Sequence, residues 1–175
     1  MNIDEIIKEL AKFEHETYPK ATDIDIQTTE KGLGKSLPNS YKTFTKQFSN
    51  GAYLFMLQEV SAVGEGNDQI MPIHKIELIE GDDEEIISLR DGGSTQLKNL
   101  VPFGLDSNGN AWCFIVNEIN SSGECPVAYF DSNGRKLYGK LEGFSAWLQI
   151  LIEKQDEVIR TLYDDDVLYD ELQLG

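Results

Sequence analysis

The chain has 175 residues, and 31 acidic residues against 15 basic ones give it a formal net charge of −16. This length predicts one domain that buries a hydrophobic core without the help of disulfides or metals. The acidic balance argues against nucleic acid or an anionic membrane as the partner, because phosphate contacts need clustered Lys and Arg. An acidic surface suits a basic partner, or it serves solubility alone.

Cysteine and histidine are too scattered to suggest a metal site. Cys113 and Cys125 form no closely spaced pair, and the two histidines have no zinc-ligand spacing. Cys113 lies in an apolar run, where a free cysteine behaves as a small hydrophobe. The N-terminal residues carry acids where a signal peptide carries bases, and no apolar run approaches the ~18 residues of a membrane span. The cytoplasm is therefore the expected compartment.

Helices are expected in the N-terminal third of the chain. Apolar residues recur at helical spacing over residues 3–14. Residues 24–33 suit either a strand or a short helix ended by Gly34, and we favour the helix. A further helix is predicted over residues 38–49, where aromatic residues lie on one face and Asn50-Gly51 follows as a stop signal.

The middle of the chain has the character of strands. Residues 52–76 are rich in β-branched and aromatic residues and are broken by Gly and Pro, which predicts short strands. Residues 77–85 are predicted to form a solvated acidic loop or the start of a short helix through Leu89. Asp-Ser-Asn-Gly occurs twice between apolar runs, which predicts hairpin turns with Gly109 and Gly134 at their corners. Further strands are expected over residues 101–103, 111–116, 127–130 and 136–141.

A last helix is predicted over residues 144–160, from the apolar residues that begin at Phe144. Helices followed by strands and a final helix indicate an α+β domain, with a mainly antiparallel sheet flanked by N-terminal helices and a C-terminal helix. The domain is expected to span residues 1–162. Residues 163–175 then form an acidic tail that packs on the body, stays mobile or folds on a partner.

Three segments of the chain, taken in order, resemble one known family. The first comprises Ile26, Glu30, Leu33, Gly34, Leu37, Pro38, Tyr41, Phe44, Phe48, Asn50 and Gly51. The second comprises Val101, Pro102, Phe103, Gly104, Asp106, Gly109, Trp112, Cys113, Phe114, Val127, Tyr129 and Phe130. The third comprises Phe144, Trp147 and Leu148. Over roughly residues 20–155, this pattern is similar to that of the SUKH superfamily, which includes bacterial toxin-immunity proteins and fungal regulators of cell-wall glucan synthesis.

The resemblance implies an α+β fold with a curved sheet and, in bacteria, a protein that neutralises a toxin such as a nuclease. The fungal relatives imply an alternative, a regulatory or scaffolding module that binds a physiological partner. The family shares no catalytic residues that map onto this chain. An enzyme of unrecognised type is the third hypothesis, and an adjacent toxin gene would favour the first.

Calcium binding and nucleophilic catalysis are the chemical alternatives. Residues 106–110 begin like a calcium loop, but Ala111 and Asn117 stand where an EF-hand needs glycine and glutamate. His15 in an expected helix and His74 in an expected strand are possible bases, but no nucleophile motif accompanies them. Hairpin turns and ordinary histidines are the better interpretations. We therefore expect no catalytic residue, no metal and no cofactor.

Two acidic clusters support a binding hypothesis. Clustered carboxylates speed the encounter with a basic protein and orient it, although solvated charged loops are the structural alternative. The expected partner is a basic toxin domain, without direct nucleic-acid or membrane binding. Aromatic candidates for the interface are Tyr53, Tyr138, Tyr163 and Tyr169. The candidate partner-binding residues are Glu77, Glu80, Asp82, Asp83, Glu84, Glu85, Asp164, Asp165 and Asp166.

Overall fold

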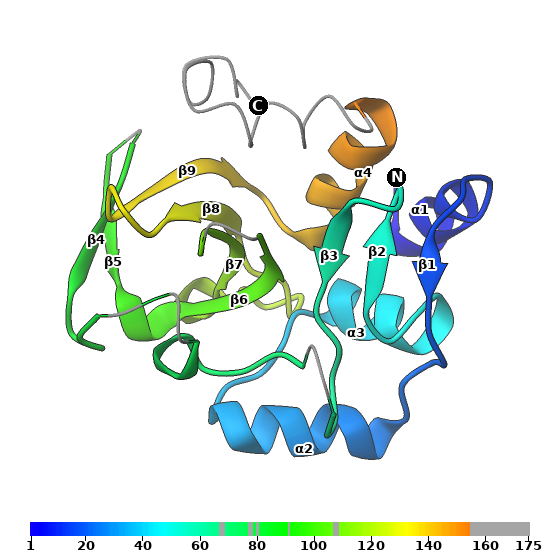
Figure 1. Ribbon diagram of the computed structural model, residues 1–175, viewed down its shortest axis with the longest axis horizontal. Helices are drawn as coiled ribbons and strands as arrows, with labels where there is room; N and C mark the ends of the chain where they lie inside the picture. The colour runs from blue at the N-terminus through cyan, green and yellow to red at the C-terminus, as the bar shows by residue number, and fades with distance from the viewer. Residues whose placement is uncertain (67–68, 77–78, 80, 91, 107–108, 155–175) are drawn as a thin grey trace.

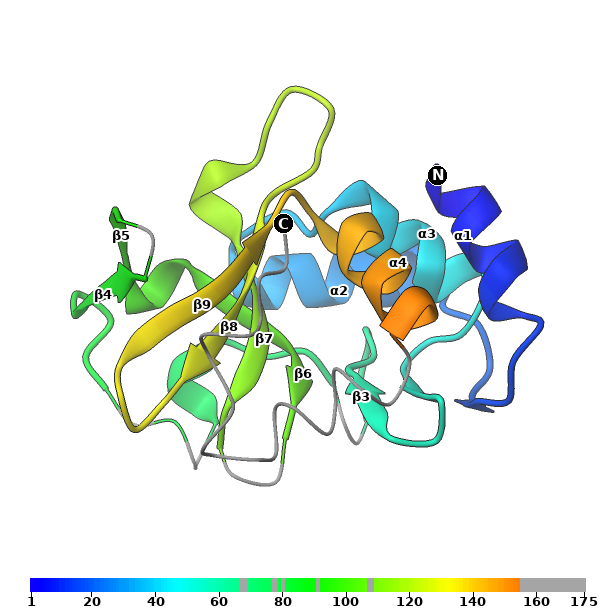
Figure 2. The same cartoon turned by 90° about the horizontal axis from the view of Figure 1, so that it is seen from above.

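The computed structural model describes residues 1–154, apart from residues 67–68, 77–78, 80, 91 and 107–108. Strands β4 to β9 form one side of the described molecule, while helices α1, α3 and α4 gather on the other (Figure 1). The view from above shows the same division (Figure 2). Apart from the two-residue strand β1 (Glu16–Thr17), which lies between α1 and α2, the helices α1 to α3 precede the strands and α4 follows them. The predicted α+β fold is confirmed.

Helix α1 (Ile3–Leu10) begins with a capping box at Asn2. The sequence pattern predicted a helix to residue 14, but the helix ends at Leu10. At this end the carbonyl oxygen of Leu10 accepts hydrogen bonds from the N–H of Phe13, at 3.0 Å, and from Nε2 of His15, at 2.8 Å. A longer helix would use that carbonyl itself. The prediction that His15 lies within a helix is therefore wrong.

Helix α2 (Asp23–Leu33) settles the ambiguity of residues 24–33 in favour of the helix. Thr22 and Asp25 form a reciprocal capping box at its start. Gly34 ends it in the left-handed conformation, with φ of 66°, which a glycine adopts without the clash of a Cβ.

Helix α3 (Asn39–Gln47) begins directly after Pro38, close to the predicted start. A residue far along the chain caps it. The carboxylate of Glu124 accepts hydrogen bonds from the backbone N–H of Ser40, at 2.8 Å, and from its hydroxyl, at 2.6 Å. A negative charge at this position also complements the helix dipole. The loop before β8 therefore fixes the start of α3.

A small antiparallel sheet has the order β1-β2-β3, and its inward side chains join the core. The N–H of Ser61 donates to the carbonyl of Phe103 at 2.7 Å, so this sheet adjoins the larger one. Residues 73–75 form a 3-10 turn, so the predicted strand at His74 is wrong. The bounds are Glu16–Thr17 for β1, Ala52–Leu54 for β2 and Gln58–Val60 for β3.

The larger sheet has the order β5-β4-β9-β8-β7-β6. Its neighbours are antiparallel except for β4 and β9, which are parallel, so the prediction of a mainly antiparallel sheet is confirmed. The sheet curls, as Figure 1 shows. The bounds are Ile86–Leu89 for β4, Ser94–Gln96 for β5, Leu100–Leu105 for β6, Ala111–Ile115 for β7, Val127–Asp131 for β8 and Lys136–Leu141 for β9.

Strand β4 corrects one sequence prediction, since a loop or helix was expected through Leu89. Ile87 and Leu89 are buried, whereas Ile86 and Ser88 are exposed. This alternation is that of a half-buried strand. The alternation of exposed and buried residues spans only four residues and directly follows a run of acids, so the sequence pattern did not predict a strand there.

The two predicted hairpin corners lie where expected, between β6 and β7 and between β8 and β9. Gly109 has φ of 80°, as an Asn-Gly turn requires. In the second turn the carboxylate of Asp131 accepts from the N–H groups of Asn133 and Gly134, both at 3.0 Å. The left-handed residue there is Arg135, with φ of 53°, rather than the glycine.

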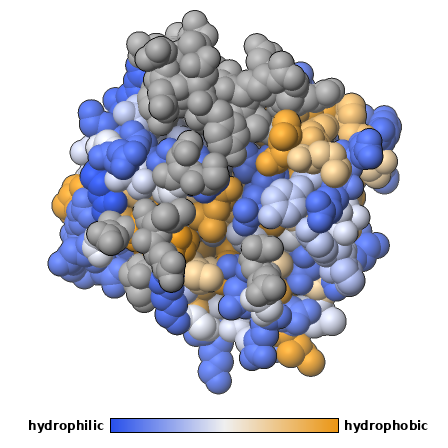
Figure 3. Space-filling view, viewed as in Figure 1, coloured by the Kyte–Doolittle hydropathy of each residue, from blue (hydrophilic) through white to orange (hydrophobic). Residues whose placement is uncertain are grey.

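Two hydrophobic clusters cover the two faces of the larger sheet. Trp112 and Phe114 of β7 join the cluster under the helices, while Cys113 between them joins the opposite one. Helix α4 (Phe144–Lys154) closes the first cluster with Trp147, and it matches the described part of the helix predicted over residues 144–160. Hydrophilic residues cover most of the face in Figure 3, and apolar colour gathers over α4.

Candidate functional site

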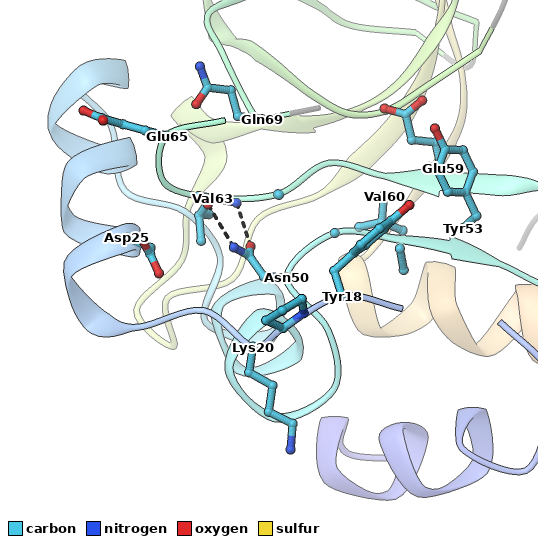
Figure 4. A pocket seen from close by; sticks show the side chains of 14 residues that line it. Tyr18, Lys20, Asp25, Asn50, Tyr53, Glu59, Val60, Val63, Glu65 and Gln69 are labelled. Atoms are coloured by element: carbon cyan, nitrogen blue, oxygen red, sulfur yellow. Dashed lines mark hydrogen bonds between the residues drawn. The ribbon is translucent and has the colours of Figure 1, made fainter. Parts of the chain in front are cut away.

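A cleft of about 530 Å³ opens beside the small sheet. We name it the β2–β3 cleft. It is lined by residues of the β1–α2 connection, the α3–β2 connection, strands β2 and β3, the start of α2, and residues 62, 63, 65 and 69 (Figure 4). Segments distant in sequence therefore converge on one concave surface, as ligand and partner sites commonly require.

Asn50 builds the floor of the β2–β3 cleft. Its side-chain amide donates to the carbonyl of Val63 at 3.0 Å, and its side-chain oxygen accepts from the N–H of Val63 at 2.8 Å. Gly51 follows with φ of 79°, and a Cβ there would approach that of Ala62 to 3.1 Å. The Asn-Gly pair that the sequence indicated as a helix stop is thus also a clamp on the residues after β3.

Helix α2 holds the far wall of the cleft. The N–H of Gly64 donates to the hydroxyl of Thr29 at 2.7 Å. Gly64 has φ of 91°, and a Cβ there would meet the carboxylate of Asp25 at 2.8 Å. Hydrogen bonds from the backbone and side chain of Thr22 hold the pKa of Asp25 below its usual value. Asp25 therefore carries its negative charge at neutral pH.

The open wall of the cleft combines tyrosine and carboxylate side chains. Glu16, Tyr53 and Glu59 are directly opposite one another across β1, β2 and β3. Their side chains point outward, because the residues beside Tyr53 and Glu59 in each strand are buried. The hydroxyl of Tyr18 donates to the carboxylate of Glu16 at 2.6 Å. Figure 4 shows Tyr18 and Tyr53 at this wall, with Glu59 beside Tyr53.

Charge in the cleft is predominantly negative. The lining contains the carboxylates of Asp25, Glu59 and Glu65, and the ammonium of Lys20. The side chain of Lys20 extends away from the cleft in Figure 4. An aromatic and acidic concave surface can bind a cationic group through ion pairs and cation–π contacts.

The acidic residues predicted as a binding cluster at positions 77–85 do not all have the same surroundings in the structure. The carboxylate of Glu85 accepts from Nε and Nη2 of Arg135, at 3.0 and 2.5 Å, and this pairing lowers the pKa of Glu85. The carboxylate of Glu84 accepts from Lys98 at 2.6 Å, which lowers its pKa as well. Both acids therefore have internal partners, which reduces the charge that they present to another protein.

Asp82 and Asp83 are exposed, as a binding role requires. One oxygen of Asp82 accepts from the N–H of Glu84 at 2.9 Å. Asp83 lines a second, smaller pocket of about 200 Å³ together with Lys35 and Lys98. Five other candidates, Glu77, Glu80, Asp164, Asp165 and Asp166, lie outside the described residues.

The cleft joins residues that the sequence did not single out. Of its aromatic and acidic residues, only Tyr53 was predicted as an interface candidate, and it is half-buried, as is Tyr138. Tyr163 and Tyr169 lie outside the described residues. Strand pairing brings Glu59 beside Tyr53, and no spacing rule reveals that pairing in advance. The sequence did single out Asn50 and Gly51, but as a signal that ends a helix and not as residues that line a cleft.

The described residues, 1–154 apart from the gaps given above, include four α-helices and three 3-10 helices. None of the helices there is both long and apolar enough to cross a membrane. In the same ranges, no three or more His, Cys, Asp and Glu side chains gather where they could hold a metal ion.

The fold is an α+β domain in which a curled, mainly antiparallel sheet packs against N-terminal and C-terminal helices. Residues 20–150, about three-quarters of the chain, match the SMI1/KNR4 family (SUKH-1), and the chain belongs to this family. The resemblance seen in the sequence is thereby confirmed. No curated protein matched the chain.

Proposed function

We propose that this protein binds and neutralises a basic protein toxin, as an immunity protein that acts by occupation rather than catalysis. Its membership of the SMI1/KNR4 family and the distribution of its charge support this proposal. Residues 77–85 carry six acids and no base, and residues 155–175 carry seven acids and one base. Each segment has a net charge of −6, so together they account for three-quarters of the total of −16.

Charge concentrated in this way acts on the encounter between two proteins. A negative segment attracts a basic surface over distances up to the Debye length, about 8 Å at physiological ionic strength. A nuclease toxin is basic where it grips phosphates, so an acidic protein is suited to cover that surface. We place this action in the cytoplasm, where a toxin delivered by a neighbouring cell would reach its target.

The first experiment searches the adjacent genes for a toxin domain, and then measures inhibition of that domain and its association with this protein. We expect the protein to abolish the activity of that toxin at equal molar amounts. We also expect association, followed by stopped flow, to slow steeply with added salt, while dissociation changes less. A complex that forms without loss of toxin activity would favour the alternative, a regulatory or scaffolding module.

The structure identifies the acids that suit a charge test. Asp82→Asn with Asp83→Asn removes two exposed charges and should slow association about two- to threefold by weakening the steering potential. Glu84 and Glu85 are left intact, because their ion pairs support the fold. The matched control is Asp4→Asn with Glu14→Gln, two exposed acids in and just after α1, a helix that Figure 1 shows on the other side of the molecule from β4. Equal rates for both pairs would show that residues 82 and 83 play no special part.

The C-terminal acids have their own variant, in which Asp164, Asp165 and Asp166 are replaced by Asn. A slower association than in the control pair would assign steering to this segment. A flat salt dependence of the wild type, with tight binding intact in all variants, would mean that the acidity serves solubility and that recognition lies elsewhere.

A further inference from the structure

The tip of the β2–β3 hairpin exposes apolar side chains to solvent. Met56 is 53% exposed and Leu57 is 51% exposed. Phe13, just beyond α1, is 37% exposed, and its ring meets that of Phe55 edge-on with the ring centres 5.4 Å apart. We name these four residues the hairpin-tip patch. Of the eight large hydrophobic side chains that are exposed among the described residues, three therefore gather in one place, whereas scattered ones need no explanation.

The backbone at the hairpin tip is held in an unfavourable conformation. Phe55 and Met56 are both left-handed, a conformation that a side chain with a Cβ disfavours. Glycine at position 56 would relieve this strain with little loss of packing, because the Met56 side chain is mostly exposed. Folding alone therefore does not explain a methionine at this position. Strained residues of this kind gather at sites where a protein binds or acts.

Contacts with the body of the protein hold the tip in shape before any partner arrives. The N–H of Phe55 donates a hydrogen bond to Nδ1 of His15, and the ring centres of these two residues are 4.8 Å apart. The His15 ring also meets that of Phe48 at the end of α3, with the centres 5.7 Å apart. A protrusion that is preorganised in this way loses little conformational entropy on binding, which leaves more of the contact energy for affinity.

Two properties of the hairpin-tip patch define the partner that it suits. Met56 is unbranched and carries a polarisable thioether, so its side chain adapts to an irregular apolar pocket. The end of α4 lies beside the hairpin in both Figure 1 and Figure 2, and the residues that follow it, 155–175, carry a net charge of −6. An anionic membrane, or a second copy of this chain at −16, would be repelled there. A basic protein with an apolar pocket would be attracted.

We infer that the hairpin-tip patch is the apolar anchor of this protein, with Met56 and Leu57 inserted into an apolar pocket that basic residues surround on a protein partner. A few side chains that fill a desolvated pocket carry most of the energy of an interface. The acidic segments act earlier and from a distance, so steering and docking need not use the same residues. In the context of the proposed function the partner is the basic toxin, and this assignment rests on that proposal.

The first probe is β-cyclodextrin, because its apolar cavity admits single side chains and its use needs no knowledge of the partner. The ¹⁵N-labelled full-length protein is titrated with it and followed by amide chemical shifts. We expect saturable shifts at Phe55, Met56 and Leu57, with a dissociation constant on the order of millimolar for so small a contact. Maltoheptaose, the open chain of the same sugar units, has no cavity and should cause no such shifts.

A β-cyclodextrin with amino groups on its rim tests the choice of a basic partner. It should bind the tip severalfold more tightly than the neutral probe at low salt, since its ammonium groups meet the negative charge nearby. The variant with Asp164, Asp165 and Asp166 replaced by Asn should lose part of that advantage. Equal binding of the two probes at the tip of the wild type would contradict a pocket surrounded by basic residues.

The variant Met56→Gly separates binding from folding. It removes the side chain and relieves the left-handed backbone, so it should weaken the neutral probe severalfold while the melting temperature does not fall. Ile24→Ala is the matched control, because Ile24 in α2 is 73% exposed and lies outside the patch. It should leave binding of the probe unchanged. Weaker binding together with a lower melting temperature would assign Met56 to the fold and overturn the anchor.

Two further results would overturn the inference. Shifts of equal size with maltoheptaose would mean that the probe touches the surface without enclosing a side chain. An absence of shifts at the tip with both cyclodextrins would show that a second copy or another part of the chain covers the patch.

A toxin domain found among the adjacent genes separates this inference from the proposed function. We expect Met56→Gly with Leu57→Ser to bind that toxin about tenfold more weakly than wild type, and Ile24→Ala to bind it equally well. If the double variant binds and inhibits the toxin as wild type does, the tip is not its docking site, while the immunity function stands. If the probes bind the tip but wild type does not inhibit the toxin, the immunity proposal fails and the apolar anchor stands.

Discussion

Phe55 and Met56 hold left-handed backbone conformations, with φ of 53° and 61°, at the tip of the β2–β3 hairpin. The N–H of Met56 donates to the carbonyl of Tyr53 at 3.2 Å, and the N–H of Leu57 donates to that of Leu54 at 3.1 Å. Residues 55–57 separate the paired Leu54 and Gln58, and the turn from Leu54 to Leu57 has both central residues at positive φ, a conformation that normally takes Asn-Gly. Side chains with a Cβ are strained there.

His15 supports this strained tip from outside the hairpin. Its Nδ1 accepts a hydrogen bond of 2.8 Å from the N–H of Phe55, while its Nε2 donates to Leu10. The neutral imidazole with its proton on Nε2 satisfies both bonds. The ring of Phe55 also makes edge contacts with His15 and Phe13. The hairpin tip is thereby fixed to the end of α1.

Replacing Met56 by glycine should raise stability. The side chain is 53% exposed, so little packing is lost, and relief of the left-handed strain is worth about 1 kcal/mol. Urea unfolding measures the change in the free energy of unfolding. Leu57→Gly is the matched control, since Leu57 is 51% exposed and is not among the left-handed residues. It should lower stability. A loss of stability in both variants would show that the Met56 side chain outweighs the strain.

At the scale of elements, Arg135 ties the start of β4 to the turn between β8 and β9. Its guanidinium pairs with Glu85 and lies 5.3 Å from the ring centre of Phe130. The paired side chains of Glu85 and Arg135 are 30% and 27% exposed, so the ion pair is partly shielded from water. This contact braces the parallel pairing of β4 with β9.

The Glu85–Arg135 pair predicts a specific dependence of stability on pH. The pairing lowers the pKa of Glu85 in the folded state, so its contribution is present above the unfolded pKa, about 4.3, and is lost as pH falls through the folded pKa. Glu85→Gln should therefore cost about 1 kcal/mol at pH 7 and less than that in acid. The free energy of unfolding, measured in urea from pH 7 to pH 3, records the difference between the two proteins.

Glu84→Gln is the control for that experiment, because the Glu84 side chain in its ion pair is 66% exposed. Solvent screens this pair more strongly, so its removal should matter less. If the free energies of unfolding of Glu85→Gln and wild type differ by the same amount at every pH, the ionised carboxylate of Glu85 does not stabilise the fold through Arg135.

The helices could be predicted from the sequence because their signals are local. The end of α2 at Gly34 and the presence of α1 and α4 were predicted correctly, whereas the C-terminal end of α1 was not. At that end His15 bonds both to Leu10 and to a hairpin distant in sequence. The cap that Glu124 provides to α3 is similarly nonlocal. Strand β4 was missed because its alternation is only four residues long.

The candidate site was less predictable than the fold. An acidic run in the sequence cannot distinguish Glu84 and Glu85, which pair with Lys98 and Arg135, from their exposed neighbours. The β2–β3 cleft arises from strand register and from the clamp of Asn50 on Val63. Both are products of tertiary structure, so composition and spacing do not contain them.

At the scale of the whole molecule, each of the two hydrophobic clusters contains one cysteine, whose reactivity can show whether that cluster opens. Cys125 lies in the cluster under the helices and Cys113 in the opposite one, and each is at most 1% exposed. Burial raises the pKa of Cys125 to about 12 and raises that of Cys113 as well. Neither thiol is therefore poised to react in the native state, since the thiolate is the nucleophile.

Both cysteines should react with a thiol reagent only through global unfolding. The variants Cys113→Ala and Cys125→Ala isolate one thiol each, and labelling at pH 8 without denaturant is followed by absorbance. We expect the two rates to agree once corrected for the stability of each variant, because the clusters share one sheet. Fast labelling of Cys125 alone would reveal a local opening of the loop before β8.

The order of strands in the larger sheet also determines how its edges meet other molecules of the same protein. An unpaired strand edge is a template for intermolecular pairing and aggregation. One edge strand, β6, lies against β3 through the Ser61 bond to Phe103. The other, β5, spans only three residues, Ser-Thr-Gln, before the chain turns into a 3-10 helix. One edge is covered and the other is short and polar, so among the described residues the larger sheet offers a second copy little backbone on which to extend.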